Sequence, residues 1–333
     1  MNAELRSLQR RNWVREVTGE REPDIVVASA DASFRSYWRV QNLPHTPIVM
    51  DAPPQREDIT PWVAVADRLR SAGLHAPDVH ASDAALGFVL MEDLGDRTYL
   101  PALDANSVDE LYGDALDALL LMQRNVSCSG LPPYDSQRLR QELNLLPQWF
   151  IGRHLGITPQ CGGLDVLESA FHALVEEALT QPQLFVHRDF HSRNLLITDT
   201  QSPGIIDFQD AVCGPIAYDL VSLLRDCYIA WPESKVQDWV ERYREQAVDA
   251  GLTDADSRTF LRWFDWIGVQ RHLKVLGIFC RLWYRDGKPQ YLADLPRVWQ
   301  YTRDVASRYE ELMPLAAMLE RWIAGRDLAK PAP

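Results

Sequence analysis

Short apolar runs separated by polar turns fill the N-terminal part of the chain. Runs of three or four apolar residues bounded by turn-forming residues are typical of buried strands. They lie at 25–27, 48–50 and 88–91, and aromatic residues mix with polar ones over 34–40. Apolar residues recur at helical spacing over 61–71, and Gly73 ends that segment. This region is therefore predicted to be a small sheet with one helix.

The rest of the chain is dominated by helical periodicity. Apolar residues recur every three to four positions over 107–124, 136–150, 164–180, 217–230, 256–285 and 295–323. Short apolar runs at 184–186, 195–197 and 205–206 interrupt this pattern and predict strands. The patterning predicts an α+β fold with two lobes: a β-rich N-lobe over 1–93 and a large, mostly helical C-lobe over 94–333.

The composition is that of an ordinary globular protein, with 46% hydrophobic and 24% charged residues in a chain of 333. Basic residues number 34 and acidic residues 47, so the net charge is −13 at pH 7. Such a surface repels phosphate backbones and anionic lipids, so we expect neither nucleic acid nor a membrane as a partner. No feature of the sequence predicts an obligate protein partner.

The five cysteines are widely spaced, their number is odd, and no C-x-x-C motif occurs. This pattern argues against a zinc site or a disulfide framework and favours a reducing compartment. The first residues contain no apolar run typical of a signal peptide, and the apolar stretch at 275–280 is too short to span a bilayer. We therefore expect a cytoplasmic protein.

The segment Val-His-Arg-Asp-Phe-His-Ser-Arg-Asn, at 186–194, carries the most specific chemical signal. Asn194 follows Asp189 by five residues, and Asp207, in Ile-Asp-Phe, follows it by eighteen. The segment matches the pattern H-R-D-x-x-x-x-N of kinase catalytic loops. In such loops one carboxylate receives the acceptor hydroxyl, while a second carboxylate and the Asn hold Mg²⁺ against the nucleotide phosphates. We therefore predict Asp189 as catalytic base or acceptor-orienting group, and Asn194 and Asp207 as metal ligands.

With these motifs the chain resembles the aminoglycoside phosphotransferase and choline kinase family, which has a protein-kinase-like fold. Within that family it is most similar to kinases that phosphorylate the anomeric C1 hydroxyl of N-acetylmuramate and N-acetylglucosamine. The strings that carry this closer resemblance are 29–35, 49–54, 207–212 and 269–275. The resemblance implies ATP as co-substrate, Mg²⁺ as cofactor and a sugar α-1-phosphate as product, in peptidoglycan recycling.

The resemblance also assigns roles to residues around the loop. His187 is expected to support the loop rather than to do chemistry, and Asp219 to brace it from a helix. His191 has no role carried over from the family and is expected to pack. Asp210 either binds substrate or metal or caps the next turn.

The nucleotide side departs from the usual kinase pattern, because the chain has no G-x-G-x-x-G motif. The residues expected at the nucleotide are Ser33, Phe34 and Arg35 of the phosphate loop and Met91, Glu92 and Leu94 of the hinge. Met50 stands where the family has a strand Lys, and Glu57 lies just before the next helix instead of within it. Arg35 or Arg39 either replaces the missing cation or is an ordinary strand-surface arginine.

On the acceptor side we predict contacts from Arg193, Asp210, Arg271 and Lys274. At helical spacing, Arg271, Lys274, Arg281 and Arg285 share one stripe, and His272 falls on the apolar side. The stripe is either a solvated face or an anion-binding wall suited to the carboxylate of muramate.

Three other interpretations stay open. In the first, the acceptor is another small molecule, as in aminoglycoside or choline kinases. In the second, the chain is a pseudokinase that binds nucleotide without turnover. The third reads His187, Asp189, His191 and Asp207 as ligands of a metallohydrolase centre.

Overall fold

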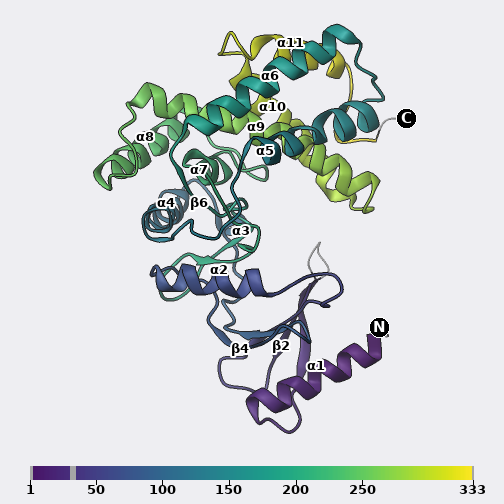
Figure 1. The fold of residues 1–333 in the computed structure, drawn as a ribbon, viewed down its shortest axis with the longest axis vertical. Coiled ribbons are helices and arrows are strands. Elements are labelled where there is room, and N and C mark those ends of the chain that lie inside the picture. Colours follow the sequence, from purple (N-terminus) through teal and green to yellow (C-terminus); the bar gives the residue numbers. More distant parts are fainter. Residues whose placement is uncertain (1–2, 31–34, 332–333) are drawn as a thin grey trace. The chain divides into compact units, whose positions relative to one another are not determined.

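The computed structural model describes residues 3–30 and 35–331, which form two compact units (Figure 1). The sheet unit comprises Met1–Val126 and Arg193–Asp210, and the helical unit comprises Ser127–Ser192 and Ala211–Pro333. The sequence patterns predicted one boundary, at residue 93. The compact units instead divide at three places in the chain, because 193–210 returns to the sheet unit.

A five-stranded antiparallel sheet in the order β1-β2-β3-β5-β4 lies at the centre of the sheet unit. Its strands are β1 (Ile25–Ala30), β2 (Ser36–Val40), β3 (Ile48–Asp51), β4 (Val79–Asp83) and β5 (Phe88–Met91). Strands β3 and β5 are buried along their whole length and pair directly, with Met50 opposite Val89. The predicted apolar strands are confirmed. Strand β4 was not predicted, because its sequence Val-His-Ala-Ser-Asp lacks an apolar run.

The helices of the sheet unit are α1 (Ala3–Thr18), α2 (Thr60–Ser71), α3 (Tyr99–Ala102) and α4 (Val108–Asn125). The predictions for α2 and α4 are confirmed to within a residue. Helix α1 was not predicted, since two of its four buried residues, Arg6 and Arg10, are charged. Its other two, Trp13 and Val14, complete the core on one side of the sheet.

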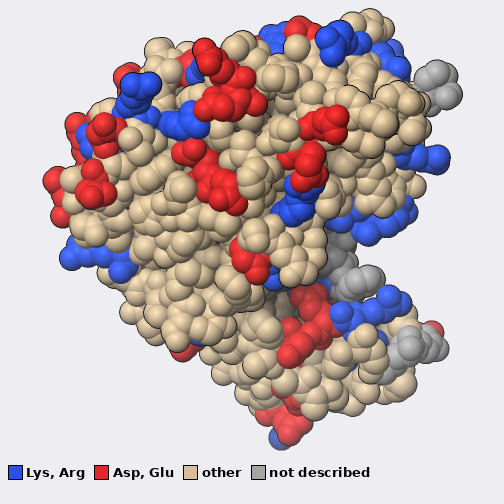
Figure 2. Space-filling model, turned by 45° about the horizontal axis from the view of Figure 1, so that its top comes forward, with Lys and Arg blue, Asp and Glu red and all other residues tan. Residues whose placement is uncertain are grey.

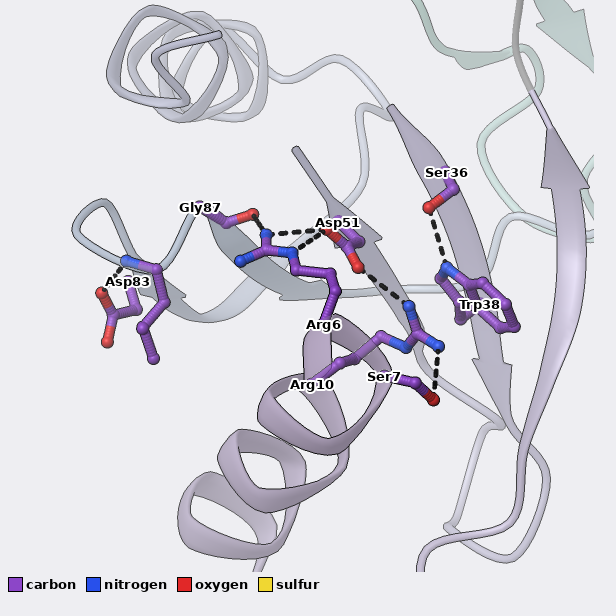
Figure 3. Close-up of polar contacts among 9 residues, drawn as sticks. Arg6, Ser7, Arg10, Ser36, Trp38, Asp51, Asp83 and Gly87 are labelled. Carbon is purple, nitrogen blue, oxygen red and sulfur yellow. Dashed lines mark hydrogen bonds and ion pairs between the residues drawn. The ribbon is translucent and has the colours of Figure 1, made fainter. Parts of the chain in front are cut away.

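Two arginines of α1 converge on one carboxylate at the end of β3 (Figure 3). Arg6 Nε donates to Asp51 Oδ1 at 2.7 Å, and Arg10 Nη1 donates to Asp51 Oδ2 at 2.8 Å. Their guanidinium groups also cover aromatic rings, Arg6 over Phe88 at 4.0 Å and Arg10 over Trp38 at 3.5 Å. The pair therefore ties α1 to the strand that carries Met50.

The returning segment 193–210 is held in the sheet unit by strand pairing. Strands β7 (Leu195–Leu196) and β8 (Gly204–Ile205) pair with each other, and they form bridges to Thr98 and His75. Both strands were predicted. They deliver Asn194 and Asp207, which flank the pair, to the sheet unit.

The helical unit is built around one long helix, α9 (Ser257–Tyr284), which was predicted over 256–285. The elements that pack against α9 include α5, η1, α6, α7, α8, η2 and α10. In chain order the unit contains α5 (Ser136–Leu143), a π-helix η1 (Leu146–His154), α6 (Cys161–Thr180), β6 (Gln183–Val186), β9 (Val212–Pro215), α7 (Ala217–Leu224), α8 (Glu233–Asp249), α9, a 3₁₀ helix η2 (Pro289–Asp294), α10 (Leu295–Ala306) and α11 (Met313–Ile323).

Some boundaries in the helical unit differ from the predictions. The segment 136–150 is not one helix but α5 followed by η1, where Pro147 lacks the N–H for a regular helical bond. The segment 295–323 breaks into α10 and α11, and Pro314 lies in the first turn of α11. Helix α8 and strand β9 were not predicted.

Two observations bear on cellular context. Among residues 3–30 and 35–331, no helix is long and apolar enough to cross a membrane. All five cysteines lie in this part of the chain, and none of them forms a disulfide there.

Candidate active site

The first half of the predicted catalytic loop follows β6 in the helical unit, and a carboxylate of α7 holds its backbone. Asp219 accepts the N–H of His187 at 2.6 Å and the N–H of Arg188 at 3.0 Å. Arg188 has a left-handed φ of 77°, which non-glycine residues rarely adopt. The structure thus brings together the loop and the residue predicted to brace it.

A second carboxylate, Asp226, holds the other end of this half-loop. Its Oδ2 accepts the N–H of Ser192 at 3.0 Å and also the Ser192 hydroxyl. Sequence reasoning missed Asp226. No local pattern points to Asp226, because it lies two residues beyond the end of α7.

Asp189 itself is half-buried, and its environment is cationic. Burial alone would raise the pKa of its carboxyl, but Lys274, His191, Arg271 and Arg188 hold the pKa below the ordinary value. The side chain is therefore ionised at neutral pH. It is suited to attract and orient a hydroxyl rather than to act as a strong base.

Arg271 and Lys274 do not lie on a solvated face, which corrects one of the two interpretations of the stripe. Both are buried, and both bond inside the helical unit. Arg271 donates from Nε to the Ser222 hydroxyl at 2.6 Å, and Lys274 donates to the Tyr218 hydroxyl at 3.0 Å. Helical spacing predicted that Arg271, Lys274 and Arg285 share one stripe, but of these three residues only Arg285 is exposed.

The other two predicted acceptor contacts, Arg193 and Asp210, are exposed and belong to the sheet unit. His272 is packed as predicted. Its ring stacks on Tyr301 with 5.1 Å between centroids, and its Nε2 bonds to the Arg225 carbonyl at 3.0 Å.

The predicted metal ligands lie next to each other in the sheet unit. The amide nitrogen of Asn194 donates to Asp207 Oδ2 at 3.4 Å, and Gln209 Nε2 donates to Oδ1 at 2.9 Å. Asp207 also has a left-handed φ of 65°. The amide nitrogen of Asn194 faces Asp207, so the amide oxygen is directed away from this hydrogen bond. Asn194 and Asp207 can therefore offer an amide oxygen and a carboxylate to a cation. These are hard ligands that suit Mg²⁺, which needs few protein ligands when phosphates and water complete its shell.

Arg35 is one of the two candidates to replace the strand lysine that the chain lacks. It is buried, its Nε lies 3.5 Å from Glu57 Oε1, and its Nη2 lies 3.5 Å from Asp207 Oδ1. Arg39 instead pairs with Asp93. Met50 is fully buried in β3. The geometry thus favours Arg35 over Arg39 as the replacement cation. Ser33 and Phe34 lie outside the described residues.

A cleft of about 480 Å³ within the sheet unit contains several of the predicted nucleotide and metal residues. Of the predicted residues, its lining includes Arg39, Met91, Glu92, Leu94, Asn194 and Asp207. Apolar lining residues that sequence reasoning missed are Ile48, Trp62, Leu196 and Ile206. A cleft lined by apolar residues together with charged and amide side chains is suited to a planar base joined to a charged tail.

The metallohydrolase interpretation finds no support in the described residues. They contain no group of three or more His, Cys, Asp or Glu side chains placed to hold a metal ion. His187 is fully buried, and its Nδ1 accepts the N–H of Asp189 at 3.3 Å. The ring of His191 packs edge-on against Tyr228.

Comparison with known sequences gives consistent results. A profile of the phosphotransferase enzyme family matches residues 24–263. A protein of Pseudomonas aeruginosa named N-acetylmuramate/N-acetylglucosamine kinase is 45% identical over 309 residues, which cover 92% of this chain and 91% of the relative. A protein of the same name from Neisseria meningitidis is 41% identical over 329 residues, covering 97% and 98%.

Solved structures show the same fold at low sequence identity. The ADP-bound aminoglycoside phosphotransferase APH(2'')-Ib matches with a TM-score of 0.59 at 14% identity, over 92% of this chain and 99% of its own. Choline kinase LicA from Streptococcus pneumoniae matches with a TM-score of 0.61 at 11% identity, over 90% and 99%. The predicted α+β, protein-kinase-like fold class is confirmed.

Proposed function

Because the chain belongs to the phosphotransferase enzyme family, we propose that it transfers the γ-phosphoryl group of ATP to the C1 hydroxyl of N-acetylmuramate and N-acetylglucosamine. The observation that carries this proposal is the 41–45% identity to kinases named for these two sugars, over nearly the whole of each chain. The product would be the sugar α-1-phosphate, an intermediate of peptidoglycan recycling.

In this proposal Asp189 acts on the acceptor. Its ionised carboxylate accepts a hydrogen bond from the C1 hydroxyl and directs the oxygen toward the γ-phosphorus. The C1 oxygen forms the new bond to phosphorus, the bond from phosphorus to the bridging oxygen of ADP breaks, and the hydroxyl proton passes to Asp189. His187 and Asp219 keep the loop in place.

On the nucleotide side, the apolar cleft of the sheet unit would hold the adenine, with Met91, Glu92 and Leu94 at its edge. Ser33, Phe34 and Arg35 would approach the phosphates. Asp207 and Asn194 would hold Mg²⁺, which neutralises charge on the phosphates when it is bound.

The acceptor contacts are proposed to come from Arg193, Asp210, Arg271 and Lys274. Arg271 supports this assignment, because it is the only one of six buried cationic residues in the described chain without a carboxylate at ion-pair distance. A carboxylate of muramate would supply that partner. Loss of the contact in Arg271→Ala should raise KM for N-acetylmuramate, and an unchanged KM would remove Arg271 from the acceptor site.

The surface charge and the cysteines of the chain bear on its partners and on its cellular location. On the face drawn in Figure 2, acidic and basic side chains are interspersed among uncharged residues. The overall charge of −13 supports small molecules, rather than nucleic acid or a membrane, as its partners. Five thiols support a reducing, cytoplasmic location.

The proposal is tested by ³¹P and ¹H NMR of the protein with ATP, Mg²⁺ and either sugar. We expect a new phosphate signal coupled to the anomeric proton, and its loss in Asp189→Ala and Asp207→Ala proteins that still fold. Bound ATP without a sugar phosphate would instead favour another acceptor or a pseudokinase. Normal turnover in either variant would overturn the mechanism.

A further inference from the structure

His75, which the mechanism above does not use, contacts two parts of the sheet unit that shape the nucleotide cleft. It lies between α2 and β4, and its side chain is only 10% exposed. The side chain of His75 meets the hinge after β5, and its backbone meets strand β8. The hinge is where the base is proposed to bind, and β8 leads to the proposed metal site.

On the hinge side, the imidazole of His75 holds the carboxylate of Glu92. Glu92 directly follows β5 and lines the cleft. Its Oε1 lies 3.2 Å from His75 Nε2, and because a carboxylate only accepts hydrogen bonds, the imidazole is the donor. Its Oε2 accepts the N–H of Asp78 at 3.2 Å and lies 3.6 Å from Arg70 Nη1. Both oxygens of Glu92 are therefore engaged by the protein, and they fix where the hinge backbone lies.

On the metal side, the backbone of His75 holds strand β8. The carbonyl of His75 accepts the N–H of Ile205 at 2.8 Å, and His75 forms a parallel bridge with Gly204. Asp207, the predicted metal ligand, follows Ile205 by two residues, and Ile206 between them lines the cleft. One residue therefore connects the hinge to the strand that carries Asp207.

We propose that His75 is a positioning residue for the magnesium–nucleotide complex, and that by tying Glu92 to β8 it sets the distance between the hinge and Asp207. The inference rests on the proposed binding of ATP and Mg²⁺ in this cleft. A ligand with a base at one end and metal-bound phosphates at the other engages both ends only while their spacing matches its own length. Either half of the ligand taken alone is insensitive to that spacing.

The first test compares the Kd of MgATP with the Kd of adenosine, which has the base but no phosphates. In His75→Leu we expect the Kd of MgATP to rise by about tenfold or more, while the Kd of adenosine changes by less than about twofold. His75→Gln, whose amide nitrogen can still donate to Glu92, should lie closer to wild type than His75→Leu does.

Three results of this comparison would overturn the proposal. An equal rise for MgATP and adenosine would indicate general damage to the hinge, and an unchanged Kd of MgATP would show that the tie has no role in binding. A His75→Gln variant that binds MgATP as weakly as His75→Leu would remove the role of the donor.

The matched control is His80→Leu, the same substitution at a histidine of the same unit. His80 lies on β4, five residues after His75, and it is exposed. We expect this variant to bind MgATP and adenosine as wild type does. A rise in the Kd of MgATP as large as that in His75→Leu would count against a specific role for His75.

A second readout does not need a ligand. Hydrogen exchange of the Ile205 amide, which donates to the His75 carbonyl, should be faster in His75→Leu than in wild type or His80→Leu, since this segment loses its tie to the hinge. If His75→Leu fails to fold, Glu92→Gln weakens the same tie from the hinge side and should have the same effect on this amide. Unchanged exchange overturns the inference. Wild-type protein that does not bind MgATP counts against the proposed function instead.

Discussion

At the scale of single residues, two members of the candidate site, Arg188 and Asp207, have left-handed φ angles of 77° and 65°. Neither is a glycine, so both positions are strained. Each is held by several polar contacts, from Asp219 at the first and from Gln209 at the second. Strain held in this way beside a predicted base and at a predicted metal ligand is typical of functional sites. Sequence spacing predicted Asp207 as a site residue, but only the backbone shows the strain.

Arg35 allows a prediction at this scale. If Arg35 with Glu57 replaces the lysine–glutamate clamp of kinases, Arg35→Met should weaken ATP binding by about tenfold, the loss of one charged contact to a phosphate. Calorimetry of ATP binding without sugar measures this directly.

The control for Arg35 is Arg39→Met, which removes the other candidate cation. Because Arg39 pairs with Asp93 and not with the predicted metal ligand Asp207, its loss should have the smaller effect on the Kd of ATP. A larger effect of Arg39→Met would reverse the assignment.

At the scale of elements, the packing of α9 against the chain just before η1 depends on one glycine. A Cβ at Gly277 would lie 2.4 Å from the carbonyl carbon of Leu145, a backbone atom that cannot turn aside. The predicted single helix over 136–150 could not reveal this contact, because it joins residues far apart in sequence. Glycine at 277 therefore serves close approach between two elements, not local flexibility.

We predict that Gly277→Ala destabilises the protein by about 1–3 kcal/mol or more, the usual cost of overpacking. Urea unfolding of the helical signal measures this. Gly268→Ala on the same helix is the control, because its Cβ would meet its nearest neighbour, Arg225 Nη1, at 3.4 Å. That variant should be neutral or slightly stabilised, since alanine favours helix. Equal stability of both variants would contradict the packing argument.

At the scale of the whole molecule, buried titratable groups act on stability in opposite directions as pH falls. Burial lowers the pKa of His272 in the folded protein to about 3. As the pH falls below about 6.5, the unfolded chain therefore takes up a proton on this imidazole before the folded protein does, and stability is lost. Burial raises the pKa of Asp219 to about 7, although two backbone N–H groups oppose this, so acidification from pH 7 adds stability. The two effects overlap, and only a difference between variants separates them.

We therefore predict that the stability difference between wild type and His272→Gln shrinks by about 2 kcal/mol from pH 7.5 to pH 5. Glutamine can still donate to the Arg225 carbonyl, but it has no proton to gain. Chemical unfolding at several pH values measures the difference. A constant difference would mean that His272 keeps an ordinary pKa in the folded protein.

The sequence by itself determined the fold class and most strands and helices, because periodicity is a local property of the chain. Motif spacing is local too, and it predicted Asp189, Asn194 and Asp207 as the chemical residues. It did not predict α1, which is anchored to Asp51 through charged residues instead of an apolar face. It could not assign 193–210 to the sheet unit, since that depends on pairing with distant residues.

The partners of buried charges were decided only by the tertiary structure. Helical periodicity placed Arg271 and Lys274 together but could not say whether they face water, because that depends on what packs against α9. Glu142 lies on the apolar face of α5, three residues after Leu139. A charged residue on an apolar face was the one local sign that Glu142 has buried partners. Its contacts with Arg188 and Lys274 join segments 46 and 132 residues away, and no pattern within one element encodes them.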